Sequence, residues 1–175
     1  MTWEVTTAAT AEPLTVDEVK TFLNLTSNED NGMLETFIQA AREWAEKSTG
    51  LKLLTQTVKQ YWDEWPTGVW DLGISPATSV TSISYKDTAG ATQTWSAANY
   101  TADTVSIPPR IFPTDDVDYP SLGQYPNPVW VTYVVGYTNP AAVPADAKAA
   151  MLQKIAFLYE NREDIPVQGV GSGYR

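Results

Sequence analysis

The sequence predicts an α+β fold: a bundle of about three helices, two N-terminal and one C-terminal, with a β-rich insertion between the second and the last helix. Apolar residues recur at helical spacing up to Gly50. Threonine, valine and aromatic residues then alternate for some 90 residues, and a long apolar segment follows Pro144. We predict a single domain over 1–175, with helices in 13–52, the insertion in 53–140, a helix in 143–163 and a flexible arm in 164–175.

The first helix is predicted from its N-terminal signals. Thr15 and Glu18 have the spacing of a capping box, in which each side chain bonds the backbone N–H of the other residue. Leu14 and Val19 occupy the two positions of a hydrophobic staple. A helix therefore starts at Thr15.

The second helix is predicted from about Glu29 to Thr49. Gly50 stands where a glycine commonly ends a helix, because glycine adopts the left-handed backbone conformation without a steric penalty. The apolar residues at helical spacing are Leu34, Phe37, Ile38, Ala41, Trp44 and Ala45. This pattern indicates an amphipathic helix with one face in the core.

The insertion is predicted to consist of short strands. DTAG (87–90) has the composition of a hairpin turn, and the proline-bearing stretch 108–128 is expected to be a loop. The segments with strand composition are 53–62, 69–74, 79–87, 91–95 and 129–138.

The last helix is apolar over much of its circumference. Its stripe consists of Ala147, Ala150, Met151, Ile155 and Leu158, widened by Leu152, Ala156 and Tyr159. A helix of this kind is expected to be buried between neighbours. It is predicted to run to about Arg162 or Glu163.

Composition excludes several kinds of chemistry. The chain has no cysteine and no histidine, so disulfides, thiol nucleophiles and imidazole bases are absent. No catalytic motif was found, and we predict neither an enzyme nor a cofactor. The N-terminus lacks the pattern of a signal peptide, and no apolar run has the length of a membrane span. The net charge of −10 disfavours binding of nucleic acid through the bulk surface, although it would let a polyanion pass without sticking.

Two features remain as candidate sites. Asp115, Asp116 and Asp118 could hold a calcium ion, but a solvated acidic loop is the commoner arrangement. Five tryptophans accompany the predicted strands, at positions 62, 65, 70, 95 and 130. Such residues could stack on sugars in a carbohydrate-binding module, although they more often belong to a core or to a protein interface.

An ordered series of motifs resembles the phage head–tail connector (adaptor) family. PLTVDEVKTFLNL is similar to its first helix, and FIQAAREWAEKSTGLKLLTQTV to its second helix and the strand after it. The series continues with SVTSISYKDTAG, with a strand that ends in VVGYT, and with a proline-led helix that ends in FLYENRE. The resemblance covers about residues 13 to 163.

The resemblance implies a structural protein of the virion, made in the host cytoplasm, that assembles as a ring of generally twelve copies under the portal protein. The ring would extend the DNA channel, contact no membrane and bind no particular DNA sequence. It would also present a platform to stopper or tail-completion proteins. Asp115, Asp116, Asp118 and Tyr119 are expected in a loop on the tail side or between subunits. The arm expected to dock on the portal comprises Ile165, Pro166, Val167, Gln168, Gly169, Val170, Gly171, Tyr174 and Arg175.

Overall fold

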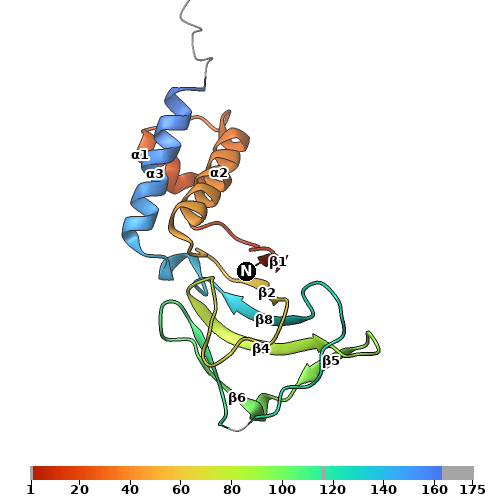
Figure 1. Cartoon of the computed structure of the whole chain (residues 1–175). Coiled ribbons are helices and arrows are strands. Elements are labelled where there is room, and N and C mark those ends of the chain that lie inside the picture. The colour runs from red at the N-terminus through yellow and green to blue at the C-terminus, as the bar shows by residue number, and fades with distance from the viewer. Residues whose placement is uncertain (1, 116, 163–175) are drawn as a thin grey trace, which may run out of the picture.

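The computed structural model describes residues 2–115 and 117–162 and has the predicted α+β architecture. The helices are α1 (Val16–Leu23), α2 (Asn31–Thr49) and α3 (Ala145–Glu160), with short 3₁₀ turns at Ala97–Asn99 and Pro140–Ala142. The strands are β1 (Thr2–Thr7), β2 (Gln56–Trp62), β3 (Trp70–Asp71), β4 (Ala77–Lys86), β5 (Thr92–Trp95), β6 (Tyr100–Asp103), β7 (Arg110–Pro113) and β8 (Val129–Val135). Figure 1 shows the three helices at one end of an elongated molecule and the strands at the other.

The helical end is organised around its own apolar core. Leu34, Ile38 and Ala41 of α2 face Met151 and Ile155 of α3, and all five are almost completely buried. This core confirms the predicted amphipathic face of the second helix over most of its length.

The predicted helix caps are also present. The backbone N–H of Glu18 donates to the Thr15 hydroxyl at 3.2 Å, and the backbone N–H of Thr15 donates to the Glu18 carboxylate at 2.7 Å. The backbone bond from Thr15 helps to lower the pKa of Glu18. Gly50 ends α2 with a φ of 71°, in the left-handed region that favours glycine.

The strands form two antiparallel sheets. The five-stranded sheet has the order β1-β2-β8-β4-β5, and the three-stranded sheet has the order β3-β7-β6. The predicted 87–90 turn joins β4 to β5, with Gly90 at a φ of 82°. A second core lies between the sheets, formed by residues such as Val58, Ile83 and Val131.

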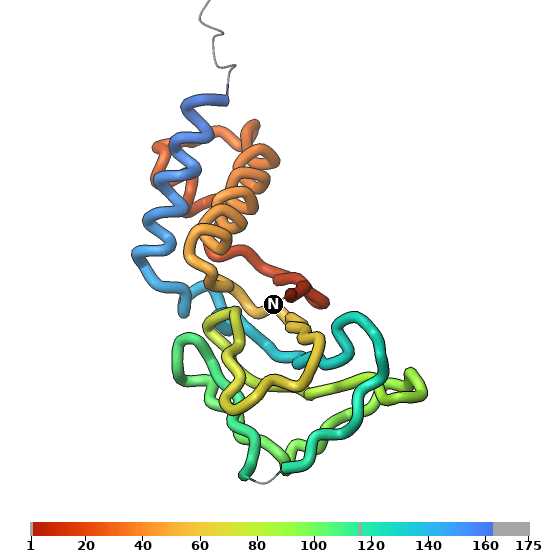
Figure 2. Tube along the Cα trace, in the orientation of Figure 1, coloured from red at the N-terminus to blue at the C-terminus, as the bar shows by residue number. Residues whose placement is uncertain are grey.

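One acidic side chain joins the helical end to the five-stranded sheet. Glu46, near the end of α2, is only 6% exposed. Its carboxylate accepts from Lys52 Nζ at 2.8 Å, from the Leu53 backbone N–H at 3.1 Å and from Gln56 Nε2 at 3.0 Å. Arg42 approaches the same carboxylate at 3.7 Å. The chain passes between the strands and the helices three times, from β1 to α1, from α2 to β2 and from β8 to α3, as Figure 2 shows, and the Glu46 contacts lie on the second of these connections.

The structure corrects several predictions. Residues 2–7 form an edge strand that was not predicted, and within 108–128 the segment Arg110–Pro113 is a strand because it pairs with both β6 and β3. Only Trp70 and Asp71 of the predicted strand 69–74 pair. The second helix starts at Asn31 rather than near Glu29, and α3 spans 145–160 rather than 143–163.

Two expectations about burial also fail. Trp44 was assigned to the buried face of its helix, but its side chain is 43% exposed. The last helix was expected to be buried between neighbours, yet only Met151 and Ile155 are fully buried and Phe157 is 58% exposed. Apolar surface therefore remains on both long helices.

Candidate functional site

The candidate site is a hollow at the end of the molecule farthest from the helices, where β6 lies in Figure 1. We call it the distal hollow. It has a volume of about 400 Å³ and is lined by Gly68, Val69, Phe112, Pro113, Thr114, Asp115, Val117 and Tyr119. Two segments that are distant in sequence thus meet here: the residues before β3, and the end of β7 with the loop that follows it.

Three large apolar side chains at the hollow are accessible to solvent. Val69 is 46% exposed, and Phe112 and Tyr119 are each 36% exposed. Exposed apolar side chains that gather in a concave site, with polar residues at its rim, are typical of surfaces that bind another protein. Asp115 supplies such a rim residue.

An aromatic cluster supports the hollow from behind. The Tyr119 ring stacks on Trp65 at 5.3 Å and on Trp95 at 5.5 Å between ring centroids. Trp70 stacks on Trp95 at 5.5 Å, and both are buried. Trp65 also donates from Nε1 to the backbone carbonyl of Pro120 at 2.8 Å, which fixes the segment after Tyr119. The loop is therefore held by large rigid rings.

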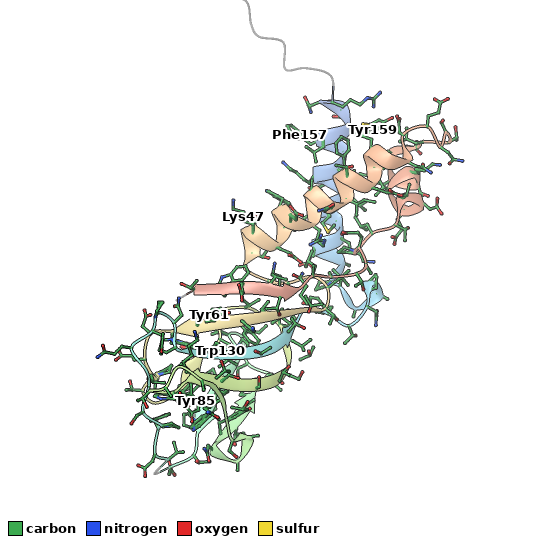
Figure 3. The ribbon with its side chains drawn as sticks, turned by 90° about the vertical axis from the view of Figure 1, so that its right-hand side faces the viewer. Lys47, Tyr61, Tyr85, Trp130, Phe157 and Tyr159 are labelled. Atoms are coloured by element: carbon green, nitrogen blue, oxygen red, sulfur yellow. The ribbon has the colours of Figure 1, made fainter. Side chains whose placement is uncertain are left out.

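These contacts bear on the role of the predicted tryptophans. Trp70 and Trp95 lie in the core between the sheets, with exposed fractions of 1% and 3%, and Trp65 packs against that core. Buried rings cannot stack on a sugar, so the core interpretation applies to these two. Trp130 instead pairs with Tyr61 across β8 and β2, at 6.2 Å between ring centroids. Figure 3 labels both residues, on neighbouring strands.

Next to the hollow, the β6–β7 connection is held in place by ionic contacts. The Asp103 carboxylate accepts from the backbone N–H groups of Val105 and Ser106, each at 3.1 Å, and from Arg110 at 2.9 Å. The bonds from Ser106 and Arg110 hold the pKa of Asp103 well below its usual range. The Arg110 guanidinium also lies 5.2 Å from the centre of the Phe112 ring, which orients that ring at the hollow.

The structure brings together only part of the predicted acidic loop. Asp115 and Tyr119 line the hollow, and Asp118 is exposed beside it, whereas Asp116 lies outside the described residues. Within 2–115 and 117–162, no three acidic side chains gather to form a metal site. The calcium hypothesis for the full set of aspartates stays a prediction.

The predicted portal-docking arm, 165–175, lies outside the described residues. The structure does fix the helix end from which it continues. Tyr159 donates to the Asp30 carboxylate at 2.7 Å, and the Arg162 guanidinium stacks 4.2 Å from the centre of the Tyr159 ring. Figure 3 places Tyr159 at the end of the helices that points away from the sheets. The end of α3 therefore lies at the opposite end of the molecule from the distal hollow.

Sequence reasoning did not identify Val69 and Phe112 as part of this site. Val69 stands in a segment with strand composition and Phe112 stands in the proline-bearing stretch. A single apolar residue is unremarkable in either place. Exposure would have distinguished them, but exposure depends on the β3–β7 pairing, which the sequence does not reveal.

No helix in the described ranges is both long and apolar enough to cross a bilayer.

Comparison with known proteins agrees with this architecture. A sequence model of the phage gp6-like head–tail connector proteins matches residues 13–93. No curated protein is significantly similar in sequence to the chain.

Three solved structures have the same fold over 94% of this chain. One is the neck of an empty gene transfer agent (GTA) particle computed with C6 symmetry, with a TM-score of 0.81 and 23% identity over 86% of that chain. The second is the virion of a native GTA particle, with a TM-score of 0.78 and 22% identity over 87% of that chain. The third is the neck of a native GTA particle computed with C12 symmetry, with a TM-score of 0.73 and 24% identity over 86% of that chain.

The match over 13–93 falls on the two N-terminal helices and the first strands that follow them, the segments that carried the resemblance in the sequence. Over these residues the chain is similar to the phage gp6-like head–tail connector proteins.

Proposed function

We propose that the protein is a structural component of a phage-like virion that joins the head to the tail as a ring under the portal protein. The observation that carries this proposal is that the chain has two separate candidate binding surfaces at its opposite ends. The helix that continues into the arm ends at one extremity, and an accessible apolar hollow lies at the other. A protein that bridges two different partners needs two such separate surfaces.

The helical end is the portal side in this proposal. The arm 165–175 docks on the portal, and the Tyr159–Asp30 bond holds the end of α3 that precedes it in the sequence. A segment that contains small and apolar residues with few charges can order along a partner's sheet edge or groove when it binds. The whole chain then acts as one connector domain, with the helices and the β region as its two ends.

The β end is the tail side. Stopper or tail-completion proteins meet the distal hollow through Val69, Phe112 and Tyr119, because these side chains are accessible and firmly supported. The buried Glu46 contacts keep this end at a fixed position relative to the helices. The ring therefore acts as a rigid spacer between portal and tail.

The C12 and C6 symmetries of the similar neck particles support twelve copies in the ring. The charge of −10 per subunit gives a ring that DNA can traverse without sequence-specific binding, since phosphate contacts need lysine and arginine.

The proposal is tested with heads that carry the portal but lack this protein. We expect the full chain to attach to these heads and to restore tail joining. A chain that ends at Asp164 should stay folded but fail to attach. Phe112→Asp should attach normally and fail to join tails, because a charge in the hollow must be desolvated when the partner binds.

The matched control is Val105→Asp, which should attach to the heads and join tails normally. Val105 is 91% exposed on the β6–β7 connection and does not line the hollow. Normal tail joining by Phe112→Asp would contradict the assignment of the tail side. Normal attachment by the truncated chain would contradict the docking role of the arm.

A further inference from the structure

The last helix exposes two opposite sides of itself. Successive residues of an α-helix turn by about 100°, so Ala150, Lys154 and Phe157 share a sector of roughly 60°, and Lys148 and Leu152 lie roughly 170° away from it. One side faces the groove between α3 and α2, and the other faces the groove between α3 and α1. This geometry explains why the sequence of α3 is apolar around so much of its circumference.

The first side, which we call the Trp44 flank, consists of Trp44, Ser48, Ala150, Lys154 and Phe157. Ser48 and Ala150 line a mainly apolar groove of about 300 Å³, with Trp44 at its edge. The Lys154 ammonium lies 5.6 Å from the centre of the Trp44 ring and 5.3 Å from the centre of the Phe157 ring. Both rings remain about half exposed, at 43% and 58%.

The second side, the Phe22 flank, consists of Asp17, Thr21, Phe22, Lys148 and Leu152. These residues line a depression of about 530 Å³ between α1 and α3. Phe22, on the eight-residue helix α1, is 47% exposed. The chain thus leaves a prominent aromatic side chain on each side of the same helical body.

The charges on the two flanks are complementary. Among the described residues, Lys154 forms no ion pair and Asp17 has no cationic partner. Glu18 stands beside Asp17 on the Phe22 flank and only weakly contacts Lys148, at 3.9 Å. Asp146 lines the Trp44 groove, so its carboxylate could pair with Lys148 on the Phe22 flank of a second copy. Each flank therefore presents an apolar centre with one cation and at least one carboxylate, so that Lys154 of one copy can face Asp17 of the next while Asp146 faces Lys148.

We propose that the Trp44 flank of one copy packs against the Phe22 flank of the next copy, and that this contact builds the ring. The inference rests on the proposed function and names the surfaces that it requires. A contact between two different patches is head-to-tail, and it closes into a ring when the rotation between copies closes. Patches on opposite sides of one helix are placed for such a repeat, whereas a twofold dimer would use one patch twice.

The test uses cross-linking, because the natural chain has no cysteine that would react. Thr21→Cys and Ser48→Cys place one thiol on each flank, at residues that are exposed and lie away from the helical core. The doubly substituted chain is assembled on portal-bearing heads and treated with a short bismaleimide. We expect a ladder of covalent multimers that extends to the full ring.

The single-cysteine chains are the matched controls and should give no ladder, because each places thiols on one flank only. Covalent dimers from a single-cysteine chain would show that copies meet through the same patch, and would overturn the proposal. So would a ring that is visible by electron microscopy on these heads but gives no ladder with the double variant. If no chain attaches to the heads at all, the proposed connector function fails instead.

A second measurement does not depend on the geometry of the cross-link. Phe157→Asp should lower the fraction of heads with complete rings at least tenfold while leaving the melting temperature of the free chain within a few degrees, since Phe157 is exposed. Val105→Asp, on the exposed β6–β7 connection, should leave ring formation unchanged. Complete rings from Phe157→Asp at the wild-type level would also overturn the proposal.

Discussion

Replacing Glu46 by alanine should uncouple the helices from the sheet. The carboxylate accepts bonds from the Leu53 backbone N–H and from Gln56 Nε2, and both of these donors are buried. Without Glu46 they lose their partner at a site that water does not reach. Lys52 and Arg42, whose side chains are 14% and 13% exposed, would also keep their charges without this carboxylate.

The size of the effect follows from these contacts. A buried donor left without a partner costs about 1–3 kcal/mol, and breaking a buried ion pair on one side costs about 3–5 kcal/mol. Because Arg42 retains its bond to Glu12 at 2.8 Å, we expect a total loss of about 3–5 kcal/mol. Small domains are stable by only about 5–15 kcal/mol, so this loss is a large share of the total.

The assay is unfolding in urea, followed by two signals. Far-ultraviolet circular dichroism reports mainly on α1, α2 and α3. Tryptophan fluorescence reports mainly on the β region, because six of the seven tryptophans lie there and only Trp44 lies in a helix. For the wild type we expect the two transitions to coincide, as in two-state unfolding. For Glu46→Ala we expect the helical transition to come first, because its junction to the sheet is broken.

Two further variants sharpen this test. Glu46→Gln keeps the shape and one acceptor oxygen, so it should lose about half as much stability as the alanine variant. Glu43→Ala removes an exposed carboxylate from the same helix and should change stability by no more than about 0.5 kcal/mol. If Glu46→Ala were as stable as Glu43→Ala, with coincident transitions, the reasoning about the junction would be refuted.

Three other predictions concern the β region. Gly136→Ala should destabilise the protein by more than about 2 kcal/mol, measured by urea unfolding, because the residue has a φ of 91° and an added Cβ would collide with the Leu54 carbonyl; an unchanged midpoint would contradict this. Gln60→Leu should cost about 2–4 kcal/mol, since the fully buried amide accepts from the Gly73 N–H at 2.7 Å and from Tyr133 at 3.1 Å; full stability would show that these bonds are dispensable. Burial and the bond to Glu4 raise the pKa of Tyr61 to about 12. Because this value exceeds the unfolded one, near 10, its contribution to stability is complete below pH 10 and is lost as the pH rises toward 12. A near-ultraviolet titration in which every tyrosine ionises near pH 10 would contradict it.

Local signals were sufficient for most of the helical end. The Thr15–Glu18 capping box and Gly50 act within one turn of helix, so the residues that decide them are neighbours in the sequence. The hairpin turn at 87–90 was predicted for the same reason. Predictions that needed a distant partner were less successful. Strand Thr2–Thr7 exists because it pairs with residues 57–61, and nothing within its own six residues specifies that partner.

The candidate site shows the same division. Asp115 and Tyr119 belong to a compact acidic and aromatic motif that the sequence reveals, and the structure places both at the distal hollow. Val69, which lies more than 40 residues earlier, joins them only through the pairing of β3 with β7. The exposure of Trp44 was likewise missed, because helical periodicity gives the direction of a side chain but not whether another element covers that direction.

By itself the sequence determined the α+β order of elements, the caps of the helices, the absence of thiol and imidazole chemistry and the resemblance to head–tail connectors. These are properties of composition or of contacts between near neighbours. Only the tertiary structure decided which apolar side chains stay at the surface: Val69, Phe112 and Tyr119 at one end, and the two flanks of α3 at the other. The physical reason is that burial depends on what the rest of the chain covers, and a surface left uncovered by the chain is available to a partner.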